Sequence, residues 1–146
     1  GWKKSVMCGK FQFAFDPGQS HRGKMSGRLT CTELLEKEPQ RGWTRAWGRW
    51  YQTGIPVQAG KHYRLRLWLK TSKDFGAGIR IWVTGTEKGT MDAKMLNTEG
   101  IWREVAIERI APKGNHLGIY LNLMEGTGTV WFDDVELLPS EQPQRK

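Results

Sequence analysis

The 146-residue chain has the length of a single domain and carries a formal net charge of +8, with eight Trp and two Cys. Such a chain can bury roughly two-thirds of the surface that its unfolded form exposes, so one compact core is expected. It has no run of about 18 apolar residues, which argues against a membrane-spanning helix, and its start lacks the pattern of a signal peptide. The charge favours an anionic partner but equally describes a solvated basic surface, because Lys and Arg are spread along the whole chain.

Short segments with strand character succeed one another along the chain. In chain order, the predicted strands are residues 24–34, 50–57, 63–70, 78–84, 102–110, 116–124 and 129–138. Loops are expected at 33–43, with one helical turn around 34–37, and at 87–100. No segment has a convincing helical period. The pattern predicts an all-β protein, a β-sandwich of two antiparallel sheets.

The domain is expected to cover residues 1–139, and the polar stretch 140–146 to be a tail or the start of a linker. The sequence is that expected of an excised mature domain. Cys8 and Cys31 are compatible with one disulfide in an oxidising compartment and equally with two buried thiols. Their spacing does not match a zinc site.

Alternation along the strands predicts which side chains leave the core. If Leu65, Leu67 and Leu69 point inward, their neighbours must project from the opposite face. The same parity on residues 50–52, 78–84 and 116–124 extends this outward set. The candidate ligand-binding residues are Trp47, Trp50, Gln52, Arg64, Arg66, Trp68, Arg80, Trp82, Tyr120 and Asn122. Trp68, Trp82 and Tyr120 are expected on one side of one sheet, with Trp43 and Trp47 at its rim.

Several large aromatic side chains on a sheet face indicate a binding surface. Pyranose rings pack flat C–H patches on Trp and Tyr, while Arg, Asn and Gln replace the water bound to sugar hydroxyls. Arginine also pairs bidentately with carboxylate or sulfate, so the ligand is a polysaccharide or oligosaccharide that could be acidic. The alternative is that loops or a partner domain cover this face and that Trp68 and Trp82 form a second small core.

Four short motifs add a family resemblance that spans most of the chain. The first is Ser20–Lys24, and the second combines Tyr51–Ile55 with Ala59–Tyr63 and Trp68–Lys70. The third is Trp102–Val105, and the fourth is Val130–Leu137. The sequence resembles the jelly-roll carbohydrate-binding modules of families 4, 9, 16 and 22, which have a galactose-binding-like fold and are often attached to glycoside hydrolases.

The resemblance implies a jelly roll that binds glycan in a groove on the concave sheet face. It also implies a secreted or cell-surface location and a covalently linked glycoside hydrolase or lyase as partner. In many members one structural calcium ion lies near the first motif and the closing acidic pair. Carried over by position, its ligands would be Asp133 or Asp134 with Ser20 and Gly23. Oxygen ligands of this kind suit calcium.

Catalytic constellations are missing from the sequence, so the chain is not expected to be an enzyme. Glycoside hydrolysis requires two carboxylates that flank one cleft, and the outward faces offer no such pair. His21, His62 and His116 are scattered, and no Ser–His–Asp pattern is present. The rival interpretations are a single-stranded nucleic-acid binder, which also stacks bases on aromatic rings along a basic groove, and a protein-interaction sandwich. We favour a glycan over nucleic acid as the partner.

Overall fold

The computed structural model of the chain describes residues 1–22, 26–37 and 44–140. Within these residues the secondary structure consists of ten β-strands. They are β1 (Lys3–Cys8), β2 (Lys10–Asp16), β3 (Ser26–Glu33), β4 (Trp47–Pro56), β5 (His62–Thr71), β6 (Gly78–Thr86), β7 (Gly89–Met95), β8 (Arg103–Ile110), β9 (His116–Met124) and β10 (Gly128–Ser140). None of the described residues forms a helix long and apolar enough to cross a membrane.

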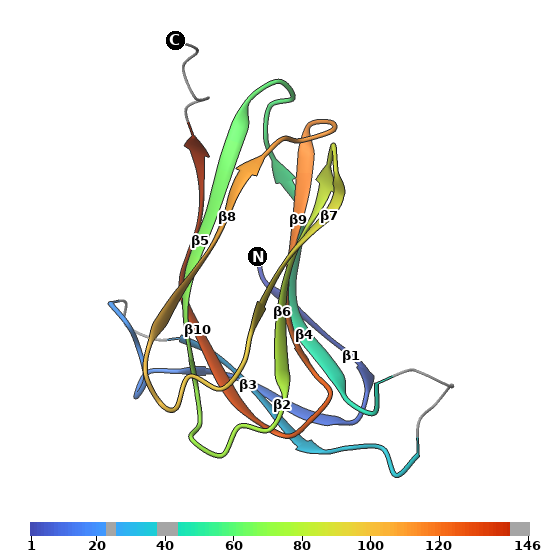
Figure 1. The fold of residues 1–146 in the computed structure, drawn as a ribbon, viewed down its shortest axis with the longest axis vertical. Helices are drawn as coiled ribbons and strands as arrows, with labels where there is room; N and C mark the ends of the chain where they lie inside the picture. Colours follow the sequence, from blue (N-terminus) through green and yellow to red (C-terminus); the bar gives the residue numbers. More distant parts are fainter. Residues whose placement is uncertain (23–25, 38–43, 141–146) are drawn as a thin grey trace.

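The strands form two five-stranded antiparallel sheets that lie as two layers (Figure 1). Sheet A has the order β1-β4-β9-β6-β7, and sheet B has the order β2-β3-β10-β5-β8. Every strand pair within the sheets is antiparallel. The predicted all-β sandwich of two antiparallel sheets is confirmed.

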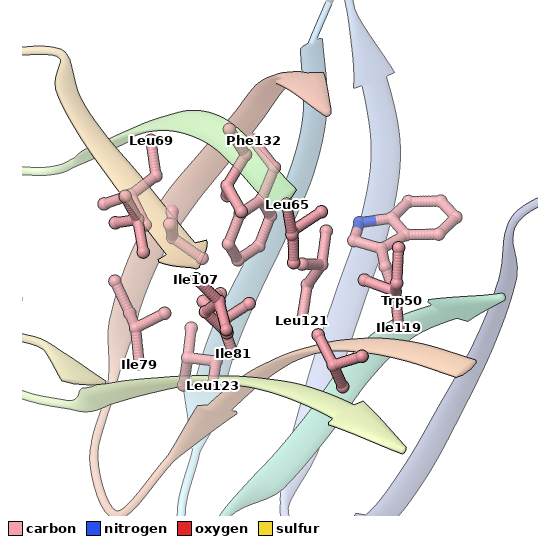
Figure 2. Packing of buried hydrophobic residues seen from close by; sticks show 14 of the residues in the cluster. Trp50, Leu65, Leu69, Ile79, Ile81, Ile107, Ile119, Leu121, Leu123 and Phe132 are labelled. Carbon is pink, nitrogen blue, oxygen red and sulfur yellow. The ribbon is translucent and has the colours of Figure 1, made fainter. Parts of the chain in front are cut away.

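The core lies between the inner faces of the two sheets. Strand β5 alternates as predicted, with Leu65, Leu67 and Leu69 fully buried and the residues between them half-buried. Sheet A contributes Ile79, Ile81 and the apolar residues of β9 from the opposite side, and Figure 2 shows these side chains packed against Leu65, Leu69 and Phe132. Removal of this apolar surface from water is the main force that holds the layers together.

Three strands were not predicted, and each lies at an edge of a sheet. Strands β1 and β7 close the two sides of sheet A, and β2 closes one side of sheet B. Edge strands bury few side chains, as the mostly exposed and half-buried residues of β1 and β7 show, so their apolar period is weak. Strand β7 falls inside the stretch 87–100, which was wrongly predicted to be a loop. The helical turn around 34–37 was also wrong, since these residues form an irregular bend.

Cys8 and Cys31 are both buried free thiols. Burial raises the pKa of each thiol, which disfavours the reactive thiolate. The stretch 141–146, which was predicted as a tail or linker, lies outside the described residues.

The turn between β9 and β10 depends on a glycine that touches another backbone. A Cβ atom at Gly126 would lie 2.1 Å from the carbonyl oxygen of Gly76 and 2.9 Å from the Cα of Ala77. Because backbone atoms cannot rotate away, Gly126→Ala is expected to lower the free energy of unfolding by about 1–3 kcal/mol. Urea denaturation measures this loss. Gly114→Ala is the control, since a Cβ there meets nothing within 4 Å, and equal stability of the two variants would contradict the turn geometry.

Candidate functional site

The predicted aromatic set is divided between the two outer faces of the sandwich. Strand β5, with Trp68, belongs to sheet B, whereas β6 and β9, with Trp82 and Tyr120, belong to sheet A. The prediction that these three aromatic residues share one face is therefore wrong. Parity assigned each strand an outward side, but it carries no information on which sheet the strand joins.

The outer face of sheet A brings together residues from three adjacent strands in two rows. One row pairs Tyr51 of β4 with Tyr120 of β9, and Tyr120 with Trp82 of β6. The neighbouring row is formed by Arg49, Asn122 and Arg80. The residues between these rows, such as Leu121 and Ile81, are buried in the core, so the two rows face away from it.

Four aromatic side chains on this face define an aromatic platform: Trp47, Tyr51, Trp82 and Tyr120. The rings of Tyr51 and Tyr120 stack with their centroids 5.6 Å apart and their planes 11° apart. Trp47 meets Trp82 edge to face at 5.8 Å. All four are half-buried, so they are fixed by neighbours while part of each remains open to solvent.

Arg49 lies among the rings of the platform. Its guanidinium carbon lies 4.6 Å from the ring centre of Tyr120, 5.3 Å from that of Tyr51 and 5.7 Å from that of Trp47. Contacts of this length are cation–π interactions. They hold the guanidinium in a defined place at the centre of the aromatic platform.

Asn122 was predicted to contact ligand, but the structure buries it completely beneath the platform. Its Oδ1 accepts a hydrogen bond of 2.9 Å from Nε1 of Trp47, and its Nδ2 donates one of 2.9 Å to the carbonyl oxygen of Arg80. Buried amides of this kind are satisfied internally. Asn122 therefore positions Trp47 and the β6 backbone, and it is not a surface group.

Arg80 is predicted correctly to lie on this face, where it is already paired. Its Nε and Nη2 donate to the two oxygens of Asp92 on β7 at 2.9 and 2.6 Å. The hydrogen bonds from Arg80 hold the pKa of Asp92 below its usual value, and a hydrogen bond from Trp82 acts in the same direction. The carboxylate thus stays ionised at neutral pH and orients both Arg80 and the neighbouring indole.

Two predicted residues of β4 point the opposite way. Trp50 is only 7% exposed, its ring meets Phe13 edge to face, and its Nε1 donates to the carbonyl oxygen of Arg28. Gln52 pairs with the buried Ile119 and shares the inner side of the sheet. Their outward placement was wrong because the parity of β4 was set one residue out of step. A cavity of about 300 Å³ borders Trp50, Trp2 and Phe15 between the sheets and lies away from the platform.

The outer face of sheet B is closed by its own contacts. The imidazole of His21 stacks on Trp68 with the ring centres 3.9 Å apart. Arg66 pairs with Glu104 at 2.6 Å, and Arg64 lies within ion-pair distance of the same carboxylate. Lys70 lies over two indole rings and hydrogen-bonds Gln19. The predicted ligand residues Arg64, Arg66 and Trp68 therefore belong to a packed layer that satisfies its own charges.

The acidic pair that was predicted to bind calcium is engaged in hydrogen bonds. Asp133 accepts one from the backbone N–H of His21 at 2.7 Å and another from the N–H of Asp134 at 2.8 Å. Asp134 lies 2.9 Å from Nδ1 of His21. Ser20 is exposed, and Gly23 lies outside the described residues.

A calcium ion takes six to eight oxygen ligands from carboxylates, backbone carbonyls and water, and of the predicted ligands Asp133, Asp134 and Ser20 lie among the described residues. Within them, no group of three or more His, Cys, Asp or Glu side chains is placed to hold a metal. Calcium binding stays a prediction that no contact of the described residues supports.

Arg49 and Tyr51 are the residues that sequence reasoning missed. Trp47 and Trp50 were predicted as ligand contacts, but the outward placement of Arg49 and Tyr51 between and beside them was not identified. The available signal was Gly48, which lies two residues before the apolar Trp50 and therefore on the same side of the strand. The structure shows a close approach there, since a Cβ at Gly48 would lie 2.6 Å from the ring of Phe11. A glycine where the sheets approach closely marks the inner parity and thereby turns Trp47, Arg49 and Tyr51 outward. Trp43 lies outside the described residues.

The architecture is that of a jelly-roll β-sandwich of the kind found in carbohydrate-binding modules. The chain is similar to a family 61 carbohydrate-binding module solved in complex with β-1,4-galactotriose, with a TM-score of 0.68 and 15% identity over 95% of this chain and 88% of that one. It is also similar to the CBM22-1 xylan-binding domain from Paenibacillus barcinonensis Xyn10C, with a TM-score of 0.66 and 17% identity over 98% of this chain and 88% of that one. The predicted resemblance is confirmed at the level of the fold.

A third similar structure belongs to a larger protein. The enzymatically active domain of bacteriophage CBA120 tailspike protein 4 matches with a TM-score of 0.71 and 14% identity over 95% of this chain, but over only 19% of its own. No protein-family model and no curated protein sequence matches the chain. Identities this low establish the shared fold alone.

Proposed function

We propose that the chain is a non-catalytic module that binds a polysaccharide or oligosaccharide across the outer face of sheet A. The observation that supports this is the aromatic platform, which consists of four half-buried rings from three adjacent strands, three of which contact Arg49. The partly open rings of this platform match the C–H faces of pyranose rings. Arginine and a paired carboxylate beside the rings match sugar hydroxyls, which both donate and accept hydrogen bonds.

Sheet A is the better candidate because its polar groups are arranged around open aromatic surface. On sheet B, Trp68 is covered by His21 and the arginines are neutralised by glutamates. A ligand on sheet B would have to break these contacts before it gained any. The glycan-binding groove was predicted on one sheet face, and its candidate residues lie on both sheets; the proposed site is the platform alone.

A binding role without catalysis agrees with the chemistry of this face. Among the described residues, the carboxylate that touches the platform is that of Asp92, and it is held by Arg80. Acid–base hydrolysis of a glycosidic bond requires a second carboxylate across the cleft. Catalysis would then come from a covalently linked glycoside hydrolase or lyase, acting outside the cell or at its surface. The tailspike match, in which this fold forms a small part of an enzymatically active domain, supports such an arrangement.

A screen of the chain against neutral, uronic and sulfated polysaccharides by affinity gel electrophoresis tests the proposal. We expect retardation by at least one glycan and weak or no binding of single-stranded DNA. If DNA binds and its affinity falls steeply with salt, as counterion release requires, the protein is a nucleic-acid binder. If no polysaccharide binds, the proposed function is wrong.

A further inference from the structure

We propose that the platform recognises an anionic glycan, and that Arg49 is the residue that binds the carboxylate or sulfate group of the sugar. This inference rests on the proposed function and specifies its ligand class. The inference depends on three observations: Arg49 has no carboxylate partner among the described residues, the charges near it are mostly positive, and it lies among aromatic rings.

Arg49 differs from the other half-buried arginines of the strands. Arg28, Arg64, Arg66 and Arg80 each form an ion pair with an Asp or Glu. Arg49 has no such pair among the described residues. Its Nε is buried without a hydrogen-bond partner there, as is that of Arg64, but the Nε of Arg64 lies 2.7 Å from the carboxylate of Glu108. The cation–π contacts to three rings fix its position but supply no counter-charge.

A half-buried charge without a counter-ion lowers stability, because burial removes water that would otherwise solvate it. Elsewhere this chain compensates such arginines with carboxylates of its own. A ligand anion would complete the pattern at Arg49, since guanidinium binds carboxylate and sulfate through paired, charge-assisted hydrogen bonds.

The surroundings of Arg49 are also cationic. Lys3 pairs with Tyr51 across β1 and β4, and Lys94 pairs with Arg80 across β7 and β6, so both lie beside the platform. Among the described residues, two acidic groups lie near this face. Asp92 is neutralised by Arg80, and Glu125, which directly follows β9, lies near Arg80. Positive charges around an aromatic surface raise its affinity for a polyanion.

The rings around Arg49 distinguish a sugar acid from a free anion. A uronic or sulfated sugar can place its ring on Trp82 or Tyr120 while its charged group reaches the guanidinium, because these groups lie in adjacent rows of the same sheet. One sugar unit of the polymer then makes both contacts: its ring stacks on an aromatic side chain, and its charged group pairs with Arg49.

The test compares charged polymers with uncharged versions of themselves. The probes are polygalacturonate with its carboxyl-reduced product, and a sulfated galactan with its desulfated product; calorimetry at near-physiological ionic strength gives the affinities. A charge-assisted hydrogen bond contributes about 1.5–3 kcal/mol, so the wild-type protein should bind at least one charged polymer about 10- to 100-fold more tightly than its uncharged partner. The arm that shows this ratio identifies carboxylate or sulfate as the group recognised.

Arg49→Gln should reduce this ratio to about one, because it lowers affinity for the charged polymer far more than affinity for the uncharged polymer. Its matched control is Arg66→Gln, which removes the same charge from the opposite face and should keep the wild-type ratio. Arg49→Gln should change the melting temperature little, because the loss of three cation–π contacts opposes the removal of an uncompensated charge. Arg49→Lys keeps the charge but loses the paired N–H donors of the guanidinium, so it should give an intermediate ratio. This variant replaces Arg49→Gln in the test if the glutamine variant does not fold.

The outcomes separate this inference from the proposed function. If charged and uncharged polymers bind equally, or if Arg49→Gln and Arg66→Gln lower the ratio equally, recognition of an anion by Arg49 is wrong and glycan binding stands. If neither member of either pair binds, the inference is wrong, and the wider polysaccharide screen decides separately whether the proposed function stands. Tighter binding of single-stranded DNA than of any glycan, lost in Arg49→Gln, would also overturn the inference.

Discussion

Trp82→Ala is expected to weaken glycan binding by about 10- to 100-fold, the effect of removing a central aromatic anchor worth roughly 1.4–2.8 kcal/mol. The indole lies beside Tyr120 in one row of the platform and meets Trp47 edge to face. It is half-buried on the outer side of sheet A, so its loss leaves the core between the sheets intact. The melting temperature should fall far less than for a core substitution. Affinity gel electrophoresis with the best glycan from the screen measures the binding change.

Trp68→Ala is the matched control for this variant, because it removes an indole from the outer face of the other sheet. Its stacking on His21 is lost, so some stability should be lost, while glycan affinity stays at the wild-type level. The reverse result, in which Trp68→Ala abolishes binding and Trp82→Ala does not, would move the site to sheet B.

Trp50→Ala should have the opposite profile, with a large loss of stability. Trp50 is 7% exposed, stacks on Phe15 with ring centres 5.4 Å apart, and donates a hydrogen bond to the carbonyl of Arg28. Replacing a buried Trp by Ala costs about 3–5 kcal/mol, and each kcal/mol lowers the melting temperature of a domain this size by roughly 2–4 °C. The cavity that already borders Trp50 would grow by the volume of the indole. Thermal and urea unfolding measure the loss.

The milder Trp50→Phe variant keeps the protein folded for a binding measurement. It should retain wild-type glycan affinity at temperatures where it is native. Reduced affinity with unchanged stability would show that Trp50 faces the ligand and that the β4 register is wrong. Together with Trp82→Ala, this pair tests the orientation of the strand that supplies most of the platform.

Alternation was sufficient to predict the central strands and their inward side chains. In β5, β6 and β9 each strand has a neighbour on both sides and one buried face, so apolar and polar residues must alternate. The edge strands lack this constraint, and β1 and β7 were missed. The alternation of Phe11, Phe13 and Phe15 did mark β2, and it was overlooked.

The site was only half predictable for a different reason. Period-two alternation fixes the side of a strand but not its sheet, and sheet membership depends on pairings between residues distant in sequence, such as Arg49 with Asn122. The outward placement was correct for Trp47, Arg80, Trp82 and Tyr120. The error concerned Arg64, Arg66 and Trp68, which face outward from sheet B and not from the sheet that carries the platform. In β4 the density of aromatic residues hid the parity, since Trp50 and Tyr51 are adjacent and only one can face inward.

The four edges of the sandwich have a consequence for how the domain behaves at high concentration. Each sheet is open, and an unpaired edge can template the addition of strands from other molecules. Here the edge strands carry charges at close intervals, with Lys3 and Lys4 on β1, Asp92 and Lys94 on β7, Lys10 and Asp16 on β2, and Arg103, Glu104, Glu108 and Arg109 on β8. Docking two such edges would bury unmatched charge. The same exposed, charged character that made β1 and β7 hard to predict thus protects the domain against edge-to-edge aggregation at high concentration.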